Sequence, residues 1–528
     1  MANVLFVDKG VPTVGIAYMA SYLKENNHDV KYFRSSMKGM FLPSVEFDLF
    51  NYIDNELNGN VDIFCVSVMA IDWPWTKEKT TLLKKRYPHI PIVAGGAFAI
   101  TSPEIILTHP DIDYVCCGDG EKPLLDMANS IDKGSLEQDM KDIPNISYRE
   151  NGNEIIREMS WRVENLDDYP FPDFTIFEGQ FCDAFFQSPG LITSRGCPYK
   201  CTYCSAPTML KAYNKIGGYV RQHGAEYMVK FLKQYDERYG LKSIIFNDDV
   251  FFLNKGWLRE FAEQYAKHIK IPFSCLGHPF AISEEVTGLL AKMNCKLVLL
   301  GLQSGDEGVR LKVGRKESNE LVVKACNALT KNKVHFSINH IFDFPWDDED
   351  NIRASASLYN EVRPQLLDVF SLVYFPKSDI IKDAVEMGYL DDDHLDIIES
   401  GDSQVEVGSY GTDVNAAATY TRNPSYKRYC FFFVAIPLLP KKFLERVISD
   451  PEKFRKVTEW TSKLPSAFSG ILKVALACKN GSQFIQFSAI YDWGFYMKKR
   501  MQRKTMAPDQ TVQDILPVYP PLRSDQSI

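Results

Sequence analysis

Three cysteines within eight residues are the feature that most limits how this chain can fold. Cys197, Cys201 and Cys204 follow a β-like run at 190–194, and a glycine and a proline flank the first of them. Glycine and proline interrupt regular structure, so we expect an irregular loop. A structural zinc site usually takes four ligands in two separated pairs, and the chain has no second Cys-x-x-Cys. The spacing favours a cubane iron–sulfur cluster with one open iron, and three buried structural cysteines are the alternative.

Length and charge describe a globular protein with several domains. The chain has 528 residues, of which 68 are acidic and 60 are basic, for a net charge of −8. This size suits roughly three to four domains, and the charge gives no reason to expect a nucleic-acid partner. The longest apolar run, at 429–440, is shorter than the roughly 20 residues of a membrane span. Twelve cysteines, with no signal peptide before the first strand, predict a reducing cytoplasm, and an oxygen-sensitive cluster predicts a setting low in oxygen.

Residues 1–135 alternate short apolar strands with amphipathic helices. Strands are expected at 4–8, 30–33, 62–69, 90–94 and 114–117. This order predicts a doubly wound, Rossmann-like α/β domain whose ligand lies beyond the carboxyl ends of the strands. Glycines at such ends let a large flat ligand approach the backbone. The candidate ligand-binding residues lie at these carboxyl ends: Pro12, Gly15, Ser67, Met69, Gly95, Gly96, Gly118 and Glu121.

The rest of the chain is predicted as a linker, a second α/β domain and a C-terminal region. Residues 136–188 are the linker, with a small hairpin and a proline-stiffened stretch. Residues 189–376 contain six strand–helix units, which predict a partial (β/α)6 TIM-type barrel, open on one side. Residues 377–528 are expected to be mainly helical and to cap the barrel or contact substrate. Within them, the aromatic-rich stretch 429–439 is expected to close the open side.

The carboxyl ends of the predicted barrel strands carry polar and aromatic residues that could bind ligands. Two adjacent carboxylates can accept hydrogen bonds from an ammonium or ribose group, or can cap a helix. An arginine fork suits a carboxylate ligand. A lone histidine or tyrosine could face substrate, and a packed core side chain is the alternative for each. In strand order these candidates are Asp248 and Asp249, His278, Arg315 and Tyr374. Gln303, Ser304, Ile341 and Phe344 are candidates only through the family resemblance described next.

The cysteine spacing, with Tyr203 just before the last cysteine, resembles the signature of the radical S-adenosylmethionine (SAM) enzymes. The resemblance implies that Cys197, Cys201 and Cys204 hold a [4Fe-4S] cluster whose open iron binds SAM through its amino and carboxylate groups. The reduced cluster would then cleave SAM to a 5′-deoxyadenosyl radical. The resemblance also implies an external electron donor, such as flavodoxin or ferredoxin.

The same resemblance extends to the strand ends that would contact SAM. Asp-Asp-x-Phe at 248–251 is similar to the segment that binds the SAM amino group in cobalamin-dependent members. Gly-Leu-Gln-Ser-Gly at 301–305, with Arg315, resembles the Gly-Val-Gln…Arg arrangement of the oxygen-independent coproporphyrinogen oxidases, in which Gln and Arg contact SAM. The segment 340–346 is similar to the family's adenine-contacting loop, with Asp343 in place of the usual glycine.

Residues 3–130 resemble the cobalamin-binding domain that precedes the cluster domain in one large radical SAM subclass. The usual cobalamin motif, Asp-x-His-x-x-Gly, places a histidine under cobalt, whereas Asp8-Lys-Gly-Val-Pro-Thr13 has none. The resemblance therefore implies cobalamin without a histidine lower ligand. A domain that binds no ligand and acts as a scaffold is the alternative.

The two modules in this order imply a cobalamin-dependent radical SAM methyltransferase. Methylcobalamin would donate the methyl group to an unactivated carbon, or a phosphinate, of a small-molecule substrate. Relatives with the same modules carry out ring formation, ring contraction or other redox chemistry, which is the second hypothesis. A non-catalytic cobalamin or iron–sulfur binding protein is the third. Residues 377–528 are expected to decide the substrate, and the sequence does not identify it.

Overall fold

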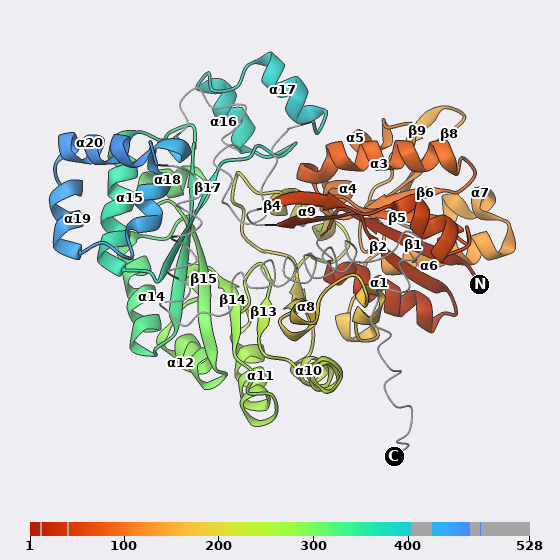
Figure 1. Ribbon diagram of the computed structural model, residues 1–528, viewed down its shortest axis with the longest axis horizontal. Helices are drawn as coiled ribbons and strands as arrows, with labels where there is room; N and C mark the ends of the chain where they lie inside the picture. The colour runs from red at the N-terminus through yellow and green to blue at the C-terminus, as the bar shows by residue number, and fades with distance from the viewer. Residues whose placement is uncertain (11–12, 40–41, 403–424, 465–471, 473–475, 477–528) are drawn as a thin grey trace, which may run out of the picture.

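The computed structural model describes residues 1–10, 13–39, 42–402, 425–464, 472 and 476, with the side chains of 37–45 left out. Two mainly parallel sheets lie side by side, the N-terminal sheet in red and the barrel sheet in green (Figure 1). The predicted fold class, a Rossmann-like domain followed by a partial barrel and a helical C-terminal region, is confirmed.

The first sheet has the strand order β2-β1-β5-β6-β7-β8-β9. Successive strand residues point to opposite faces. Val4 and Phe6 therefore pack on one side with helices α1 and α6, and Leu5 and Val7 pack on the other side with α3. The elements are β1 (Asn3–Asp8), α1 (Val14–Glu25), β2 (Asp29–Arg34), β5 (Ile63–Ser67), α3 (Trp73–Arg86), β6 (Ile92–Gly95), α4 (Ala97–Thr101), α5 (Pro103–Leu107), β7 (Tyr114–Cys116) and α6 (Glu121–Lys133).

Part of the predicted linker belongs to this first sheet. Strands β8 (Ile146–Glu150) and β9 (Asn153–Ile155) form the expected hairpin, and β8 pairs antiparallel with β7. The hairpin covers an edge strand whose backbone groups would otherwise lack partners. The N-terminal structural unit therefore extends beyond residue 135. A further hairpin and short helices complete this part of the chain: β3 (Ser36–Gly39), β4 (Leu42–Glu46), α2 (Leu49–Asn51), α7 (Leu136–Asp139) and α8 (Asp183–Gln187).

The second sheet has six parallel strands in the order β10-β13-β14-β15-β16-β17. In the described residues β17 does not pair with β10, so the barrel is open, as predicted. The strands are β10 (Gly190–Leu191), β13 (Ile244–Phe246), β14 (Phe273–Gly277), β15 (Cys295–Gln303), β16 (His335–Phe342) and β17 (Leu366–Ser371). The helices are α9 (Ala206–Asn214), α10 (Ala225–Tyr239), α11 (Lys255–His268), α12 (Glu284–Lys292), α13 (Glu307–Lys312), α14 (Asn319–Lys331) and α15 (Glu349–Val362).

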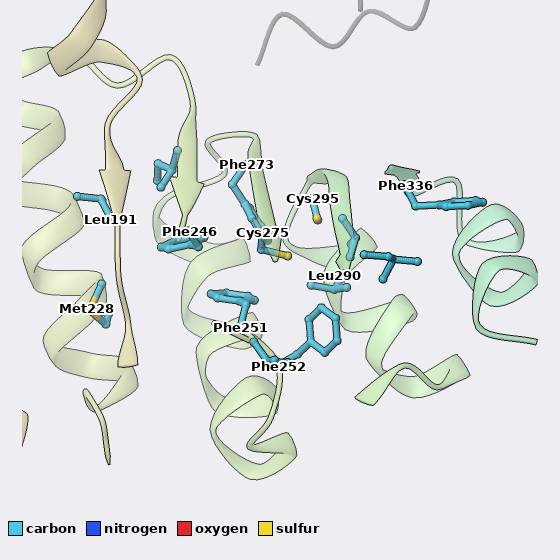
Figure 2. Packing of buried hydrophobic residues seen from close by; sticks show 14 of the residues in the cluster. Leu191, Met228, Phe246, Phe251, Phe252, Phe273, Cys275, Leu290, Cys295 and Phe336 are labelled. Carbon is cyan, nitrogen blue, oxygen red and sulfur yellow. The ribbon is translucent and has the colours of Figure 1, made fainter. Parts of the chain in front are cut away.

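The apolar layer between the barrel strands and their helices is rich in aromatic side chains. Phe246, Phe251 and Phe273 pack against one another, with ring centroids 4.7–5.6 Å apart (Figure 2). Cys275 lies in the same layer and is buried (Figure 2). These strand residues point outward, so the alternate positions face the inside of the open barrel.

A short antiparallel ribbon joins the two sheets. It consists of β11 (Ser194–Arg195) and β12 (Arg221–Gln222), which pair Ser194 with Gln222 and Arg195 with Arg221. Residues 190–194, predicted as one strand, are thus divided between β10 in the barrel and β11 in the ribbon. The cysteine segment follows directly after β11.

The C-terminal region is helical where it is described: α16 (Ile380–Glu386), α17 (Asp392–Glu399), α18 (Ser425–Ala435), α19 (Lys441–Ile448) and α20 (Pro451–Thr461). The stretch 429–439 does not close the open side of the barrel. It lies mostly in α18, where Phe433 packs on the outward side chains His340 and Phe342, each with a ring-centroid separation of 4.8 Å. The aromatic side chains of β16 need a helix to cover them, and α18 is that helix. Within the described part of the chain, no helix is both long and apolar enough to cross a membrane.

Candidate active site

The cysteine loop is held in place by segments that are distant in sequence. Gly196 has a φ of 96°, and a Cβ there would lie 2.7 Å from the Tyr219 carbonyl oxygen, so this position requires glycine. The Thr202 N–H donates to the Val313 carbonyl, and the Ile380 N–H donates to the Thr202 carbonyl, both at 3.1 Å. The irregular loop predicted from the sequence is therefore fixed by tertiary contacts on both sides.

The three cysteines are free thiols that lie near one another. Cys201 is buried, and Cys197 and Cys204 are partly exposed. Burial, together with the nearby Asp249, Cys201 and Cys204, raises the pKa of Cys197 to about 12. Burial also raises the pKa of Cys204, although the Ala206 N–H donates to its sulfur at 3.4 Å. These thiols are therefore protonated until a metal binds, and iron would displace their protons.

The loop suits a cluster better than a single ion. Among the described residues, no three His, Cys, Asp or Glu side chains converge as the ligands of one metal ion would. A cubane differs because each of its cysteines binds a different iron, so the sulfurs are spread around it. Three adjacent thiols on one fixed loop, two of them partly exposed, fit that requirement.

Arg315, which lies between α13 and α14, reaches the cysteine loop. Its Nη1 donates to the Cys201 sulfur at 3.7 Å and to the Tyr203 hydroxyl at 3.5 Å. Its Nε donates to Glu317 at 2.7 Å, and its Nη2 donates to the Gly301 carbonyl. The sequence predicted Arg315 beside SAM but gave no sign of Glu317, whose carboxylate fixes the guanidinium.

Three predicted cofactor contacts and Tyr374, which was predicted to face substrate, meet in one apolar cluster beside the cysteine loop. Buried Phe344 and Tyr374 and partly buried Tyr203 and Ile341 belong to it. The Tyr203 and Phe344 rings are 5.8 Å apart between centroids. Tyr374 lies three residues beyond the end of β17, because this strand ends earlier than predicted. The cluster provides an apolar wall next to the cysteines, of the kind that could receive a flat ring.

Asp248 bonds to the chain just before the cysteine loop. Its carboxylate accepts hydrogen bonds from the Thr193 N–H at 3.0 Å, the Thr193 hydroxyl at 2.8 Å and the Ser194 hydroxyl. Burial raises its pKa to about 6, and these hydrogen bonds limit the rise. The carboxylate that the sequence predicted to accept hydrogen bonds from SAM therefore anchors the segment just before the cysteine loop, which we call its stem.

Asp249, unlike its neighbour Asp248, is not buried. Its side chain is exposed, and its charge acts on Cys197 and Cys204. Desolvation raises its pKa, which indicates a recess walled by protein. The alternative that either carboxylate caps the next helix is wrong, because Asn254 caps α11 and its side chain accepts from the Trp257 N–H at 3.1 Å.

His278 lies against the cysteine loop, stacked on Tyr199 with centroids 4.0 Å apart. Its Nδ1 accepts from the Phe280 N–H at 3.3 Å, and its Nε2 is 3.9 Å from a Glu317 oxygen. Burial, followed by the charge of Arg315, lowers its pKa to about 2, so the ring is neutral. The second Glu317 oxygen is buried and has no hydrogen-bond partner among the described residues.

Gln303 and Ser304, next to each other at the end of β15, differ in what they can reach. Gln303 is partly exposed and has a left-handed φ of 73°. The Ser304 hydroxyl is buried, lies 3.3 Å from the Ser355 hydroxyl and accepts from the Asp306 N–H at 3.2 Å. Gln303 is therefore open to a ligand, whereas the Ser304 side chain is bonded within the protein.

Asp343 shows how this chain manages without the usual glycine in the loop after β16. It has a φ of 70°, a conformation that aspartate tolerates better than most residues. Its carboxylate accepts from the Ser371 hydroxyl at 2.6 Å and from the backbone N–H groups of Ser425 at 2.7 Å and Tyr426 at 3.3 Å. The aspartate thus keeps the turn and also anchors the start of α18.

The carboxyl edge of the first sheet is open at some of the predicted positions. A Cβ on Gly15 or Gly95 would meet no atom closer than 3.9 Å. Met69 exposes 48% of its surface at this edge, which is high for a long apolar side chain. Open backbone and an exposed apolar side chain fit a large flat ligand such as cobalamin. Pro12 lies outside the described residues.

Two further predicted residues contact each other beside this opening. Gly96 has a φ of 94°, and a Cβ there would lie 3.0 Å from the Val68 backbone and 3.1 Å from the Ser67 hydroxyl. Glycine at this position therefore lets β6 lie close to the chain after β5. Ser67 is partly exposed and remains accessible to a ligand.

The last part of the edge, after β7, faces the barrel domain. A Cβ on Gly118 would lie 2.7 Å from the Asn145 side chain. Glu121 is 2% exposed and forms an ion pair of 2.5 Å with Arg195, two residues before the first cysteine. The structure thus brings the carboxyl edge of the first sheet and the cysteine loop into direct contact.

Comparisons with known proteins agree with this arrangement. Residues 191–355 match the family model of the radical SAM superfamily, and residues 4–128 match that of the B12 binding domain. An uncharacterized methyltransferase of Pyrococcus horikoshii is 25% identical over 350 residues, which cover 65% of this chain and 72% of the relative. An anaerobic magnesium-protoporphyrin IX monomethyl ester cyclase of Synechocystis is 21% identical over 68% of this chain and 70% of the relative.

A solved structure shows the same fold. It is the radical S-adenosylmethionine methyltransferase TsrM of Kitasatospora setae, with cobalamin and a [4Fe-4S] cluster bound. The superposition has a TM-score of 0.59 at 15% identity and covers 73% of this chain and 78% of the other.

Proposed function

We propose that this chain, a radical SAM enzyme with an N-terminal B12 binding domain, methylates an unactivated carbon or a phosphinate of a small-molecule substrate. The observation that carries the proposal is the contact between the two edges, where Glu121 follows β7 and pairs with Arg195 of the cysteine stem at 2.5 Å. A methyl group can pass to a substrate radical only if both cofactors border one space. The similarity to methyltransferases across most of the chain supports the same chemistry.

The chain's own residues would bind and orient the cofactors. Cys197, Cys201 and Cys204 would hold the cluster, which supplies the electron that cleaves SAM, taken from a donor such as flavodoxin or ferredoxin. Tyr203 and Phe344 offer an apolar wall for adenine. In this proposal their burial also excludes water from the radical.

Arg315, Asp249 and Gln303 are the proposed polar contacts to SAM. The Arg315 guanidinium already donates to the Cys201 sulfur, so a carboxylate bound at the neighbouring open iron would come within its reach. Asp249 is exposed beside the cysteines and could accept hydrogen bonds from the SAM ammonium group. Gln303 is the accessible amide for the ribose.

We infer that cobalamin binds without a histidine under cobalt. The first domain has three histidines, and all of them precede strands: His28 lies before β2, His89 before β6 and His109 before β7. They therefore belong to the amino edge of the sheet, opposite the proposed ligand edge. His28 is also hydrogen-bonded, since its Nδ1 accepts from the Ala2 N–H at 3.1 Å.

The test is an anaerobic reconstitution with iron, sulfide and cobalamin, followed by a strong reductant and SAM without substrate. We expect methylation of the bound cobalamin, seen in its absorption spectrum, and release of one S-adenosylhomocysteine per methyl group. Retained cobalamin that stays unmethylated while 5′-deoxyadenosine forms would contradict methyl transfer. Failure to retain cobalamin would contradict the assignment of the first domain.

Non-methylating chemistry, such as ring formation, is the second candidate, because the cyclase relative matches a similar share of the chain. It predicts turnover with 5′-deoxyadenosine but without S-adenosylhomocysteine. The same reconstitution therefore separates the two candidates.

A further inference from the structure

Four buried charged side chains meet where the first domain contacts the ribbon that leads to the cysteine loop. Asp119 and Glu121 follow β7 in the first domain, and Arg195 and Arg221 face each other across the β11–β12 ribbon. The exposed fractions of their side chains are 3%, 2%, 16% and 6%. We call these four residues the interdomain ion cluster.

Asp119 is the centre of this interdomain ion cluster. Its Oδ2 accepts from Arg221 Nη1 at 2.5 Å and its Oδ1 accepts from Arg221 Nη2 at 3.1 Å, so the pair is bidentate. Arg195 Nη1 lies 3.4 Å from Oδ1, and the Tyr213 hydroxyl donates to it at 2.8 Å. Burial opposes ionisation, but Arg221 and Arg195 hold the Asp119 pKa at about 2. A bidentate buried pair fixes orientation as well as distance.

Arg195 connects both carboxylates and is enclosed by aromatic rings. Its Nη2 donates to Glu121 at 2.5 Å. The guanidinium carbon lies 5.4 Å from the ring centroid of Tyr18 in the first domain and 5.5 Å from that of Tyr169. The Tyr18 hydroxyl is 2.8 Å from His223 Nε2, directly after β12. Contacts on both strands therefore bind the ribbon to the first domain.

The ribbon has a second anchor on the barrel side. Ser194 donates to Asp248 at the end of β13, while the next residue, Arg195, turns to the first domain. Cys197 follows two residues later. The position of the first cysteine is thus determined by one carboxylate from the barrel and two from the B12 binding domain.

We propose that Asp119 and Glu121 are positioning residues that hold the cysteine loop in register with the B12 binding edge, and so set the placement of the two cofactors relative to each other. This inference rests on the proposed function. Neither residue touches a reacting atom. Both act through Arg195 and Arg221, and Cys197 is connected to the first domain through that contact.

Charge, rather than apolar packing, gives this contact a defined geometry. Apolar surfaces can slide without losing much contact, whereas a buried ion pair tolerates little displacement because an unpaired buried charge is costly. In the described part of the chain, one Glu121 oxygen is buried without a hydrogen-bond partner, and the other pairs with Arg195 of the ribbon. Methyl transfer between two cofactors is sensitive to displacements of about 1 Å, which is the scale that such pairs control.

The test compares Asp119→Asn, Glu121→Gln and Arg221→Lys with Asp173→Asn in reconstituted full-length protein. Asp173 also pairs with the first domain, through Lys24 at 2.7 Å, but does not contact the ribbon. We expect Asp119→Asn to form S-adenosylhomocysteine at least tenfold more slowly, with 5′-deoxyadenosine formation, iron and cobalamin content within twofold of wild type. Arg221→Lys keeps the positive charge but loses the two-pronged contact of the guanidinium. Its rate of S-adenosylhomocysteine formation should therefore lie between those of wild type and Asp119→Asn. General destabilisation would lower both products together.

A second measurement needs neither cofactor nor catalysis. Amide hydrogen exchange of the apo-protein should be at least tenfold faster in segments 116–122 and 193–204 of Asp119→Asn, and unchanged there in Asp173→Asn. If Asp119→Asn does not fold, Glu121→Gln takes its place, with exchange expected to rise in 193–204. Unchanged exchange in both segments, or equal loss of both SAM products, would overturn the proposal. A wild-type protein that forms no S-adenosylhomocysteine would instead overturn the proposed function. The hydrogen-exchange result would still test the positioning role of Asp119 and Glu121.

Discussion

The barrel sheet and the first sheet both present carboxyl strand ends to a proposed cofactor, but they use their polar residues differently. In the barrel, Arg315 is paired with Glu317, and Asp248 is bonded to the stem of the cysteine loop. At the first sheet, one end of the edge is bonded across the domain contact and the other is not. Asp119 has a pKa held at about 2 by two arginines, whereas burial raises the Asp8 pKa to about 7.

This difference shows which part of the first sheet is fixed by the domain contact. The β7 end is bound to the ribbon through the ion pairs of Asp119 and Glu121. At the β1 end, the Asp8 carboxylate accepts from the Gly10 N–H at 3.1 Å and has the favourable charge of Arg34 nearby, but burial and the like charge of Asp72 outweigh these and raise its pKa. A buried carboxylate that is only partly compensated costs stability. Such sites are typical of ligand edges, where the binding partner supplies part of what the protein lacks.

The largest effect is expected at the barrel edge, where the cysteine loop has no substitute for a lost thiolate. Cys201→Ala should abolish 5′-deoxyadenosine formation, because a cluster held by two cysteines would not keep the geometry that SAM cleavage requires. Iron content and product are measured after anaerobic reconstitution. The control is Cys326→Ala, which removes an equally buried thiol on α14 far from the loop. A Cys201→Ala protein that still makes 5′-deoxyadenosine would refute the cluster assignment.

An intermediate effect is expected at the β1 end of the first sheet. Asp8→Asn should stabilise the apo-protein at pH 8, because the ionised carboxylate is disfavoured in the folded state. The folded pKa is about 7 against a reference of 3.8, so the gain is at most about 4 kcal/mol above pH 7 and falls toward zero as the pH approaches 4. Urea unfolding midpoints at pH 8 and pH 5 measure it. Asp142→Asn, at an exposed position, should show no such pH dependence, and an equal gain for Asp8→Asn at both pH values would contradict the prediction.

The sequence predicted the elements that depend on local patterns. The barrel helices at 255–268 and 319–331 have the predicted bounds, because their apolar residues recur at helical spacing and Asn254 and Ser318 cap them. The irregular cysteine loop was predicted from the glycine and the proline that flank Cys197. A strand was predicted to end at Gly95 and Gly96, and β6 does end at Gly95, with Gly96 directly after it.

The sequence could not predict the contacts that depend on three-dimensional proximity. Asp119 and Arg221 belong to different domains, and nothing local to either residue indicates the pair. Asp248 was predicted to bind SAM because its carboxylate lies at a strand end and resembles the family's SAM-binding segment. In the structure that carboxylate accepts from Thr193 and Ser194 instead. The α18 helix was misplaced because an aromatic stretch fits a lid and a covering helix equally well.

The smallest predicted effect concerns the hydrogen bond between Arg315 and the Cys201 sulfur. Its Nη1 donates to the Cys201 sulfur at 3.7 Å, and hydrogen bonds to cluster sulfurs favour the reduced, more negative state. Arg315→Lys replaces a fixed fork with a flexible ammonium. We expect the midpoint potential of the SAM-free cluster to fall by about 40 mV, which corresponds to about 1 kcal/mol for one electron.

The matched control for that measurement is Lys316→Met, which removes an exposed charge from the adjacent residue. Its charge is screened by solvent, so its effect on the potential should be several times smaller. Glu317→Gln should give a shift in the same direction as Arg315→Lys, because the Nε contact of 2.7 Å orients the guanidinium toward the sulfur. Equal shifts in Arg315→Lys and Lys316→Met would mean that net charge, and not the bond to Cys201, tunes the cluster. Arg315 would then act through its charge alone. In that case the barrel edge would resemble the β1 end of the first sheet, where the domain contact does not fix the charged groups.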